Sequence, residues 1–554
     1  MTEKNWWEEA IIYQIYPMSY KDTTNNGVGD INGIIEKLDY IQSFGVNTLW
    51  INPLTLSNHD DNGYDVIDYK KVDPLFGTDE DKDRLIKEAK DRGFRLIFDL
   101  PLNHTSENHP WFKEALKGKD NPYRDYYIWA DSDGDPYPNN WVAGFGGSAW
   151  TKKLNGDQYY LHLFKEKMPD LNWDHEPLRK EIADIINYWV EKGIDGFRLD
   201  AFIYLDVDKE FPDHPEEYGE AQDVVENGRK LKEYLLELNE KINKEERNIF
   251  IIGEATSADA DKTKWYTDNH LVDKVITLQY LTDKDDEKME DLPEDKQHVP
   301  LDLKKFKETQ KAFQEKASEK GGPILFWSNH DIPRAPQKYG DMENYRDSTA
   351  KMMATLLYLQ PGIPIIYYGE EIGMKNAWFE DPENITDAGV MEFYEAAREK
   401  GWSHERAMTN LNLTSRDNSR GIMQWTDEER VGFTDDAAPW MIYAREEKYN
   451  VKDQEADESS ILNYYRKLFK LRKCDVFQNG SWTLLDTKET LYAYKREYEK
   501  KEALILCNFS SESDVFEYDS LQEYKEITLY TKGIEINESS VTLPPYGACV
   551  LVTE

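Results

Sequence analysis

Cysteine is scarce in this sequence. The chain of 554 residues contains three, Cys474, Cys507 and Cys549, all of them near its C-terminal end. Two of the three lie within apolar runs, LILCNF and ACVLV, that are typical of β-strands. An odd number of cysteines in such runs indicates buried thiols and not a framework of disulfide bonds. The cysteines therefore favour a cytoplasmic protein held together by its hydrophobic core.

Long hydrophobic runs are also missing. No segment approaches the roughly 18 consecutive apolar residues that a membrane-spanning helix needs. The N-terminal sequence MTEKNWWEEAIIYQIYP has no basic start, no continuous apolar stretch and no small-residue cleavage site, so it is unlike a secretory signal. We expect no membrane partner, and the missing signal again favours the cytoplasm.

Positive charge is in deficit. The chain has 68 Lys and Arg against 108 Asp and Glu, a formal net charge of −40, which argues against nucleic acids, anionic membranes and acidic substrates. A small neutral ligand such as a sugar fits this charge, and so does an ordinary, well-solvated surface. The sequence leaves open whether the protein is a monomer or a homodimer.

What the sequence does have is a regular alternation of apolar runs and amphipathic stretches. Segments such as DKDRLIKEAKDRG and EIADIINYWVEKG end at a glycine, as helices do. We expect eight strands between such stretches, within residues 11–17, 47–53, 94–104, 194–201, 248–255, 272–280, 322–331 and 362–374. Eight alternating strand and helix units predict an α/β fold with a closed (β/α)₈ barrel.

Two regions break the alternation. Residues 105–173 are rich in Trp, Tyr, Pro, Asn and Gly, and they follow the third strand, so they predict a small inserted domain over the C-terminal face of the barrel. After 474 the chain changes to short alternating runs such as TLYAYKREY, which predict an antiparallel β-sandwich. The expected division is 1–104 and 174–474 for the barrel, 105–173 for the insertion and 475–554 for the sandwich.

Three acidic residues stand where predicted strands end. Asp200 ends GFRLDA, Glu254 ends IIGEA and Asp331 ends WSNHD. Each of them could cap the helix that follows. Barrel enzymes, however, collect their catalytic groups at these strand ends, and the cleavage of a glycosidic bond needs a pair of carboxyl groups. Three carboxylates at the strand ends of one barrel favour the catalytic interpretation.

Basic and aromatic companions lie beside these carboxylates. Arg198 precedes Asp200 by two residues on the same strand, so both side chains point to one face and the guanidinium holds the carboxylate ionised. His104 and His330 also stand at strand ends. Alone, each would be interpreted as a buried core histidine, but beside three carboxylates they are candidate donors to sugar hydroxyls.

These segments carry a family resemblance. The sequence resembles glycoside hydrolase family 13, the α-amylase superfamily, in FDLPLNH, GFRLDA, IIGEA and WSNHD, which match four signature regions, and in MPDLNW, GVGDINGI and GIPIIYYGEEIGM. Within that superfamily it is similar to the α-glucosidase and oligo-1,6-glucosidase branch more than to endo-amylases. The segments that carry this second similarity are NHDDNGYDVIDY, NPYRDYY, YYIWAD and SRDNSRGIMQW.

The resemblance implies a retaining hydrolase that needs no cofactor for its chemistry. Asp200 would be the nucleophile, Glu254 the general acid/base and Asp331 a stabiliser of the transition state. The pocket for the non-reducing glucose would be lined by Asp61, Tyr64, His104, Arg198, His330 and Arg420. Tyr64 would stack on the sugar ring, and Asp61 with Arg420 would close the pocket end, giving an exo-acting enzyme. Arg416 is the less favoured candidate for that arginine.

The residue after the nucleophile bears on the bond that is cleaved. In this branch it tends to be Val in 1,6-acting enzymes and Ala or Thr in 1,4-acting ones, and here it is Ala201. The resemblance thus favours an α-1,4-specific α-glucosidase, although Ala201 could also be a variation in packing. Met168 replaces a Gln of many relatives, and GEATSAD departs from the usual sequence after the acid, so the leaving-group subsite differs from theirs.

Four other functions stay open. They are an oligo-1,6-glucosidase, a trehalose-6-phosphate hydrolase, a transglucosidase or sucrose isomerase, and a catalytically dead barrel that serves as a binding protein. The phosphate substrate needs a basic patch. Sucrose isomerases carry an arginine- and aspartate-rich loop that is not found near 331–340. A dead barrel would have lost the carboxylates that this chain retains.

A structural Ca²⁺ site is a further expectation. The segment DTTNNGVGD resembles a calcium loop of relatives, and Ca²⁺ takes several oxygen ligands. The candidate ligands are Asp22, Thr24, Asn26, the carbonyl oxygen of Val28, and Asp30. The alternative is a metal-free turn closed by Asp and Asn side chains.

Overall fold

The computed structural model describes residues 5–132, 136–152, 158–216, 219–281, 289, 292–293, 296–317 and 322–553. At its centre lies an eight-stranded sheet of parallel strands, in the order β11-β10-β9-β5-β2-β1-β13-β12. Its two end strands, β11 and β12, are in contact, so the barrel is nearly closed. The strands are β1 (Ile12–Ile15), β2 (Thr48–Ile51), β5 (Arg95–Pro101), β9 (Gly196–Asp200), β10 (Phe250–Glu254), β11 (Lys274–Ile276), β12 (Ile324–Leu325) and β13 (Ile363–Tyr367). Each lies within one predicted run, which confirms the barrel.

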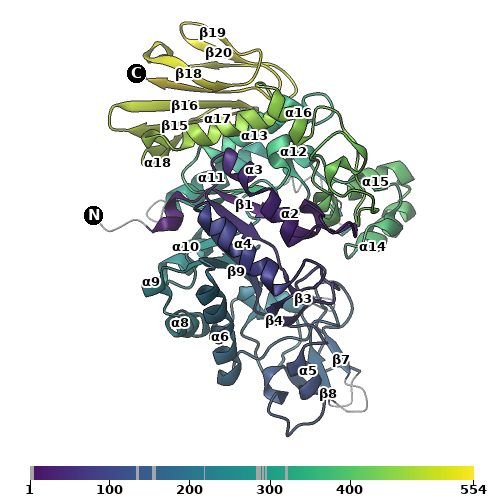
Figure 1. Cartoon of the computed structure of the whole chain (residues 1–554). Helices are drawn as coiled ribbons and strands as arrows, with labels where there is room; N and C mark the ends of the chain where they lie inside the picture. Colours follow the sequence, from purple (N-terminus) through teal and green to yellow (C-terminus); the bar gives the residue numbers. More distant parts are fainter. Residues whose placement is uncertain are drawn as a thin grey trace.

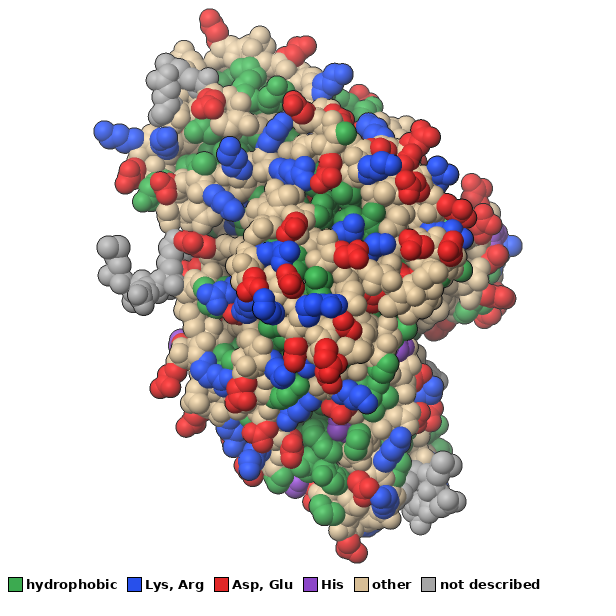
Figure 2. All heavy atoms as spheres, viewed as in Figure 1, with side chains coloured by type: hydrophobic (Ala, Val, Ile, Leu, Met, Phe, Trp, Pro, Cys, Tyr) green, Lys and Arg blue, Asp and Glu red, His purple; other side chains and the backbone are tan. Residues whose placement is uncertain are grey.

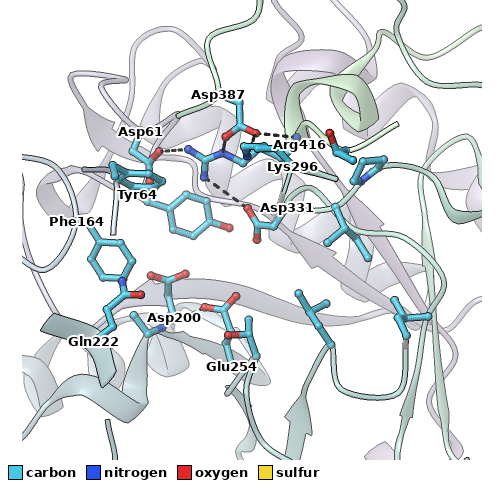
Figure 3. A pocket seen from close by; sticks show the side chains of 18 of the residues that line it. Asp61, Tyr64, Phe164, Asp200, Gln222, Glu254, Lys296, Asp331, Asp387 and Arg416 are labelled. Atoms are coloured by element: carbon cyan, nitrogen blue, oxygen red, sulfur yellow. Dashed lines mark hydrogen bonds and ion pairs between the residues drawn. The ribbon is translucent and has the colours of Figure 1, made fainter. Parts of the chain in front are cut away.

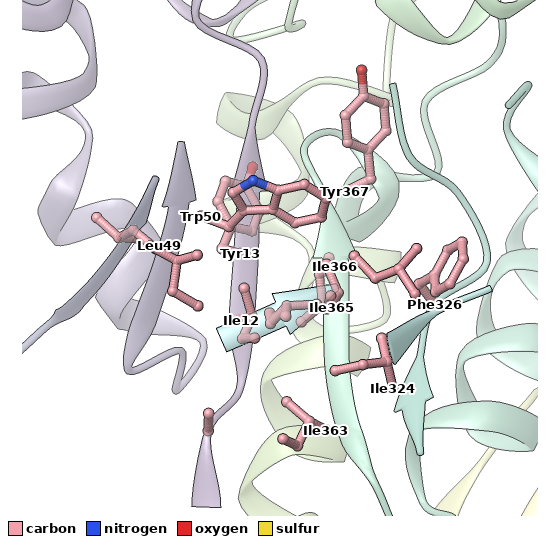
Figure 4. Close-up of a cluster of buried hydrophobic side chains, with 14 of the residues drawn as sticks. Ile12, Tyr13, Leu49, Trp50, Ile324, Phe326, Ile363, Ile365, Ile366 and Tyr367 are labelled. Carbon is pink, nitrogen blue, oxygen red and sulfur yellow. The ribbon is translucent and has the colours of Figure 1, made fainter. Parts of the chain in front are cut away.

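The barrel core is made of large apolar side chains from neighbouring strands (Figure 4). Ile12, Leu49, Ile324 and Ile365 are all buried, and they come from β1, β2, β12 and β13. Strands of a parallel sheet are covered on both faces, which is why these runs are continuously apolar and do not alternate with polar residues. The first polar residues after each run therefore fall at the barrel rim.

The helices begin and end at sequence signals. The side chain of Thr78 caps α4 (Asp79–Asp91), and Gly93 follows its end with φ 83°. Gly193, with φ 111°, ends α6 (Glu176–Lys192). The amphipathic stretch after β1 forms two shorter helices, α2 (Ile31–Glu36) and α3 (Leu38–Ser43), because the backbone leaves the helical conformation at Lys37. Other helices that cover the barrel are α8 (Leu231–Lys241), α10 (Ala260–Asp268), α11 (Leu303–Ala317), α13 (Arg346–Tyr358) and α17 (Ile461–Arg472).

The insertion after β5 builds its own small sheet. Its elements are α5 (Pro110–Ala115), β6 (Trp129–Asp131), β7 (Trp150–Lys152) and β8 (Gln158–Leu161), and the three strands pair antiparallel in the order β6-β8-β7. Trp141 and Trp150 share a core with Val207, Ala221 and Val225, which come from the segment after β9. The hydrophobic core of the insertion therefore includes residues beyond 173. The domain boundaries at 104 and 173 remain a proposal.

The C-terminal part is a sandwich of two antiparallel sheets, as predicted (Figure 1). The larger has β14 (Ser481–Leu484), β15 (Leu491–Tyr498), β16 (Lys501–Asn508), β21 (Ala548–Thr553) and β18 (Tyr524–Tyr530), and the smaller has β17 (Asp514–Glu517), β20 (Ser540–Leu543) and β19 (Glu535–Ile536). Cys507 on β16 and Cys549 on β21 are buried, Cys474 is exposed, and all three are free thiols. The prediction of buried thiols is thus confirmed for two of them.

The visible surface mixes charges of both signs. On the face shown in Figure 2, acidic and basic side chains alternate over all parts of the molecule, and no basic stripe of the kind that binds nucleic acids crosses that face. None of the helices within the described residues is long and apolar enough to cross a membrane.

Candidate active site

A cavity of about 490 Å³ opens at the carboxyl ends of the barrel strands (Figure 3). Asp200 and Glu254, the last residues of β9 and β10, line it together with Asp331. Asp331 lies in the loop after β12, where the side chain of Asn329 accepts hydrogen bonds from the backbone N–H groups of Asp331 and Ile332 at 2.8 and 3.0 Å. The predicted residues Asp61, Tyr64, His104 and Ala201 line the same cavity. The three carboxylates face a common space.

The buried guanidinium of Arg198 joins these carboxylates. Its Nη1 donates to Asp200 and, at 2.9 Å, to Asp99, while its Nη2 contacts Glu254 and lies 3.9 Å from Asp331. Asp99 also accepts hydrogen bonds from Trp50 and Asn52 at 2.8 and 2.9 Å. One guanidinium therefore meets four carboxyl groups, of which Asp99 is buried and the three that line the cavity are partly exposed, so they cannot all ionise with equal ease.

The environment separates the pKa values of the three carboxyl groups. Burial raises the pKa of Glu254 to about 8, against the opposing charge of Arg198, and the nearby Asp200 and Asp331 raise it further. Burial also raises the pKa of Asp200 to about 6, against the opposing charge of Arg198. Burial acts on Asp331 as well, but His330, Arg420, Arg198 and Arg416 outweigh it and lower the pKa. At pH 7, Glu254 is protonated, and Asp200 and Asp331 are ionised.

Tyr64 and His330 form one layer at the base of the cavity. Their rings stack with centroids 5.4 Å apart, and the Tyr64 hydroxyl lies 2.5 Å from Nε2 of His330. The side-chain nitrogen of Gln14 lies 2.9 Å from Nδ1 of His330, and because an amide nitrogen only donates, Nδ1 is the acceptor. The proton of the neutral imidazole is thereby assigned to Nε2, 3.0 Å from a carboxylate oxygen of Asp331. Burial lowers the pKa of His330 to about 3, so the ring is neutral.

His104 is a buried ring in the lining of the cavity. The backbone of Tyr64 is its polar neighbour, and neither ring nitrogen makes a well-formed hydrogen bond within the described residues. Burial lowers the pKa of His104 to about 4, which leaves a neutral ring with one donor and one acceptor at pH 7. Buried polar atoms are rarely left unsatisfied, so the ring is arranged for a ligand or for water.

The arginine that meets Asp61 is Arg416, and the preference for Arg420 at this position is corrected. Arg416 donates to Asp61 at 3.1 Å and to Asp387 at 2.8 Å, whereas Arg420 donates to the carbonyl oxygen of His330 at 2.9 Å and lies 3.5 Å from Asp331. Both arginines lie in the 3₁₀ helix η9 (Arg416–Arg420). With three residues per turn, positions four apart point about 120° away from each other, so one arginine reaches the cavity and the other packs behind it.

Comparison with known proteins identifies the fold and the chemistry. A model of the α-amylase catalytic domain matches residues 14–480, and a model of the C-terminal domain of the α-amylase SusG matches residues 491–550. The chain belongs to the α-amylase family. It is therefore a glycoside hydrolase, and the resemblance to the α-glucosidase branch is confirmed by its relatives.

Relatives of known name cover the whole chain. The oligo-1,6-glucosidase of Bacillus cereus is 38% identical over 99% of both chains, and the trehalose-6-phosphate hydrolase of Bacillus subtilis is 39% identical over 98% of both. Among solved structures, the trehalose-6-phosphate hydrolase of Bacillus licheniformis superposes with a TM-score of 0.90 at 37% identity, covering 99% of this chain and 100% of that one. A trehalulose synthase superposes with a TM-score of 0.90 at 34% identity, with the same coverage.

Other residues of the α-amylase-family cavity escape motif analysis. Phe145, Phe164 and Gln222 line it from the insertion and from α7 (Ala221–Val225), where no motif marks them. Lys296 and Asp387 also line it and form an ion pair at 2.9 Å. Gln14 and Asn52 lie behind the cavity. The sequence offers one sign of their importance, since each is a polar residue within an otherwise apolar strand run.

The predicted calcium loop is filled by hydrogen-bond donors. The carboxylate of Asp22 accepts from the backbone N–H groups of Thr24, Asn25 and Gly27 at 2.8–2.9 Å, and from the hydroxyl of Thr434 at 2.7 Å. Asp30 accepts from the N–H groups of Thr23 and Gly33 at 2.6 and 2.8 Å, and Asn26 from that of Val28 at 2.8 Å. These hydrogen bonds occupy the carboxylate oxygens that a Ca²⁺ ion would need as ligands, so the loop as it stands does not fit a calcium site. Within the described residues, no cluster of three or more His, Cys, Asp or Glu is arranged to hold a metal.

Proposed function

We propose that the protein is an exo-acting, retaining α-glucosidase that releases glucose from the non-reducing end of short α-glucosides, with a preference for α-1,4 linkages such as that of maltose. The observation that carries the proposal is the pair formed by Asp200 and Glu254. They end adjacent strands, face one cavity and contact the same guanidinium, yet one is ionised and the other protonated at neutral pH.

The proposed reaction has two steps. Ionised Asp200 attacks the anomeric carbon, the bond to the leaving oxygen breaks, and Glu254 gives its proton to that oxygen. Glu254, now ionised, takes a proton from water, and the water oxygen displaces Asp200 from the glucosyl-enzyme. Two inversions leave the α configuration unchanged. Burial of Glu254 maintains the acid that the first step needs.

The remaining groups are assigned to binding of the non-reducing glucose. Asp331 remains ionised and receives the Nε2–H of His330, so it is placed to accept hydrogen bonds from sugar hydroxyls and to stabilise positive charge at the anomeric carbon. The ion pair of Asp61 and Arg416 closes one end of the cavity, and the ring of Tyr64 offers a flat surface to the sugar. A closed end supports exo action.

The preference for 1,4 linkages rests on Ala201. It lines the cavity and its backbone N–H donates to Glu254 at 3.2 Å, so its side chain lies close to the acid that protonates the leaving group. The backbone of Ala201 has φ 50°, where a β-branched residue is strained. A valine at this position would fill space beside the scissile bond and disturb the contact with Glu254.

Hydrolysis of trehalose 6-phosphate is the second candidate. Lys296, Lys338 and Arg416 line the cavity and supply positive charge of the kind that a phosphate group needs. The ionised Asp387 pairs with both Lys296 and Arg416, however, and their charges lower its pKa to about 2 against the effect of burial. Because this carboxylate opposes the binding of an anion, we favour a substrate with a neutral leaving group over trehalose 6-phosphate.

A comparison of kcat/KM for maltose, isomaltose, sucrose and trehalose 6-phosphate tests the proposal, with Asp200→Ala as the blank. A preference for maltose supports the proposal. A preference for isomaltose or for trehalose 6-phosphate would contradict the proposed substrate but leave the proposed mechanism unchanged. Analysis of products at high maltose concentration separates hydrolysis from the transfer or isomerisation that the similarity to trehalulose synthase suggests. Activity that survives in the blank contradicts the mechanism.

Three accompanying predictions remain to be measured. A cytoplasmic location and a monomeric or homodimeric state are expected, and light scattering on the purified protein measures the latter. A structural Ca²⁺ at 22–30 stays a prediction that the hydrogen bonds of Asp22 and Asp30 oppose. Thermal unfolding with added CaCl₂ and with EGTA tests it, since a bound ion raises the melting temperature.

A further inference from the structure

We propose that Lys165 of the insertion is a positioning residue for the catalytic cavity, where it holds Asp61 and Phe145 in place to receive the terminal glucose. The inference rests on the proposed function, because it concerns the end of the cavity that is assigned to this sugar. Asp61 and Phe145 line the cavity, whereas Lys165 lies behind them and is not part of the lining. Lys165 therefore acts through its neighbours and not by touching the substrate.

The ammonium group of Lys165 binds the segment that carries Asp61, which is the turn between β3 (Thr55–Ser57) and β4 (Val66–Val72). Its Nζ lies 3.5 Å from a carboxylate oxygen of Asp61 and donates a hydrogen bond of 2.5 Å to the carbonyl oxygen of Asp60. Lys165 comes 105 residues after Asp60 in the chain. The contact therefore ties the insertion to a turn of the barrel.

Asp61 meets two cations from different parts of the chain. Arg416 donates to Oδ1 of Asp61 at 3.1 Å (Figure 3), and Lys165 approaches the same oxygen. Burial raises the pKa of Asp61, but the charges of Arg416 and then Lys165 act against it, and the pKa is lowered overall. Asp61 thus stays ionised beside the cavity and can accept hydrogen bonds from sugar hydroxyls. Lys165 supplies a part of this stabilisation that does not depend on η9.

The ring of Phe145 is held by the same two cations. Its centroid lies 5.4 Å from Nζ of Lys165 and 5.0 Å from the guanidinium carbon of Arg416. Cations are attracted to the face of an aromatic ring, and more strongly where water is partly excluded. Phe145 also contacts Phe164, with ring centroids 6.0 Å apart, and both rings line the cavity. One ammonium group therefore fixes a carboxylate and an aromatic ring that the sugar meets.

The backbone around Lys165 is itself held by hydrogen bonds. The carbonyl oxygen of Lys165 accepts from the N–H of Met168 at 2.8 Å, which closes a turn, and the side chain of Met168 is buried. The carbonyl oxygen of Lys167 accepts from the N–H of Glu107 at 2.8 Å, which attaches this turn to the segment after β5. A fixed backbone lowers the entropy cost of holding the side chain of Lys165 in one position.

Lys167 provides a comparison within the same turn. Its Nζ binds the carboxylate of Asp60 at 2.7 Å, and its side chain is 53% exposed, against 31% for Lys165. Both lysines therefore attach the insertion to Asp60, but within the described residues the ion pair with Asp61 belongs to Lys165. A variant of Lys167 separates a general loosening of the turn from the loss of the contact with Asp61.

Steady-state kinetics with maltose test the proposal in Lys165→Met, which keeps the length of the side chain and removes its charge. We expect KM to rise at least about threefold with kcat little changed, because the contact aids binding of the terminal glucose in the ground state and the transition state alike. Lys165→Arg, which keeps the charge, should restore most of the loss, and Lys167→Met should leave KM unchanged. An unchanged KM in Lys165→Met, a fall in kcat alone, or an equal rise of KM in Lys167→Met overturns the proposal.

Binding of glucose reports on this end of the cavity without turnover. In calorimetric titrations the Kd for glucose should rise at least about threefold in Lys165→Met, and this effect should be strongly reduced when Asp61→Asn is also present, since the two residues act through one contact. An effect that persists in full contradicts the assignment.

The two measurements together separate the inference from the proposed function. Glucose binding that weakens in Lys165→Met, in a protein that hydrolyses no glucoside, refutes the proposed function alone. Hydrolysis of maltose by the unmodified protein, with the same glucose binding in Lys165→Met, refutes the role of Lys165 alone. Absence of both hydrolysis and glucose binding in the unmodified protein overturns both.

Discussion

Arg416 and Asp61, 355 residues apart in the sequence, meet at 3.1 Å in the lining of the cavity that holds the three carboxylates. Asp61 is buried and Arg416 is partly exposed, and the charges of Arg416 and Lys165 lower the pKa of Asp61 even though burial acts in the opposite direction. Figure 3 shows the chain of contacts continuing from Arg416 to Asp387 and Asp331. In the proposed enzyme this pair is the wall against which the non-reducing glucose ends.

Removal of this pair should lower kcat/KM for maltose. Arg416→Ala and Asp61→Ala are each expected to cost about 2–3 kcal/mol of transition-state binding, or roughly 30- to 150-fold, because each removes a direct ion-pair partner at the cavity, although Asp61 keeps Lys165 at 3.5 Å and Arg416 keeps Asp387 at 2.8 Å. In a double-mutant cycle the two losses should be strongly non-additive. Additive losses would show that the two side chains act separately and that the end wall is assigned wrongly.

The pH dependence of kcat/KM should be bell-shaped. Activity is expected to fall below about pH 6, where the proposed nucleophile Asp200 takes up a proton, and above about pH 8, where the proposed acid Glu254 loses its proton. These limbs belong to the coupled pair of carboxyl groups. With an activated aryl α-glucoside, which needs no acid, Glu254→Gln should keep the acidic limb and lose the alkaline one. An alkaline limb that persists in this variant contradicts the role of Glu254.

Gln14 is predicted to be a positioning residue for His330. Gln14→Glu presents an acceptor to Nδ1 in place of a donor, so the imidazole should carry a proton on Nδ1 and its pKa should rise. We expect kcat/KM to fall about 10- to 100-fold, and the ¹⁵N shifts of His330 to report the changed protonation. Gln14→Leu, which removes the donor without adding charge, is the control for folding. Unchanged ¹⁵N shifts in Gln14→Glu are the contradicting result.

Ala201→Val should change linkage preference. The larger side chain lies beside Glu254 and the departing sugar, so the ratio of kcat/KM for isomaltose to that for maltose is expected to rise by at least about tenfold. The β-branched residue at positive φ should also cost on the order of 1 kcal/mol of stability, seen in urea unfolding. Ala201→Ser, of similar size and not branched, is the matched control. An unaltered ratio in Ala201→Val removes the structural basis for the 1,4 preference.

The sequence predicts the barrel and its carboxylates because both depend on local order along the chain. An apolar run forms a buried strand, and the first acidic residue after it falls at the rim, as Asp200 and Glu254 do. The position of Asp331 is harder to predict, since β12 ends at Leu325, six residues earlier in the chain. The turn that Asn329 stabilises places Asp331 at the cavity.

Other features depend on tertiary packing that no single run encodes. The choice between Arg416 and Arg420 follows from the phase of a short 3₁₀ helix, and spacing alone does not fix that phase. The contact of Gln14 with His330 joins residues from the two ends of the barrel sequence. The contact of Lys165 with the turn between β3 and β4 joins the insertion to the barrel, and neither segment indicates it alone.

In the proposed mechanism Asp200 forms a covalent bond to glucose, and trapping this intermediate measures that role without any other step. The protein is incubated with 5-fluoro-α-D-glucosyl fluoride, which slows the second step, then digested and analysed by mass spectrometry. We expect one added fluoroglucosyl group, located on Asp200, and none in Asp200→Ala. A label on another carboxyl group, or turnover of the fluoride in Asp200→Ala at the rate of the unmodified protein, would contradict it.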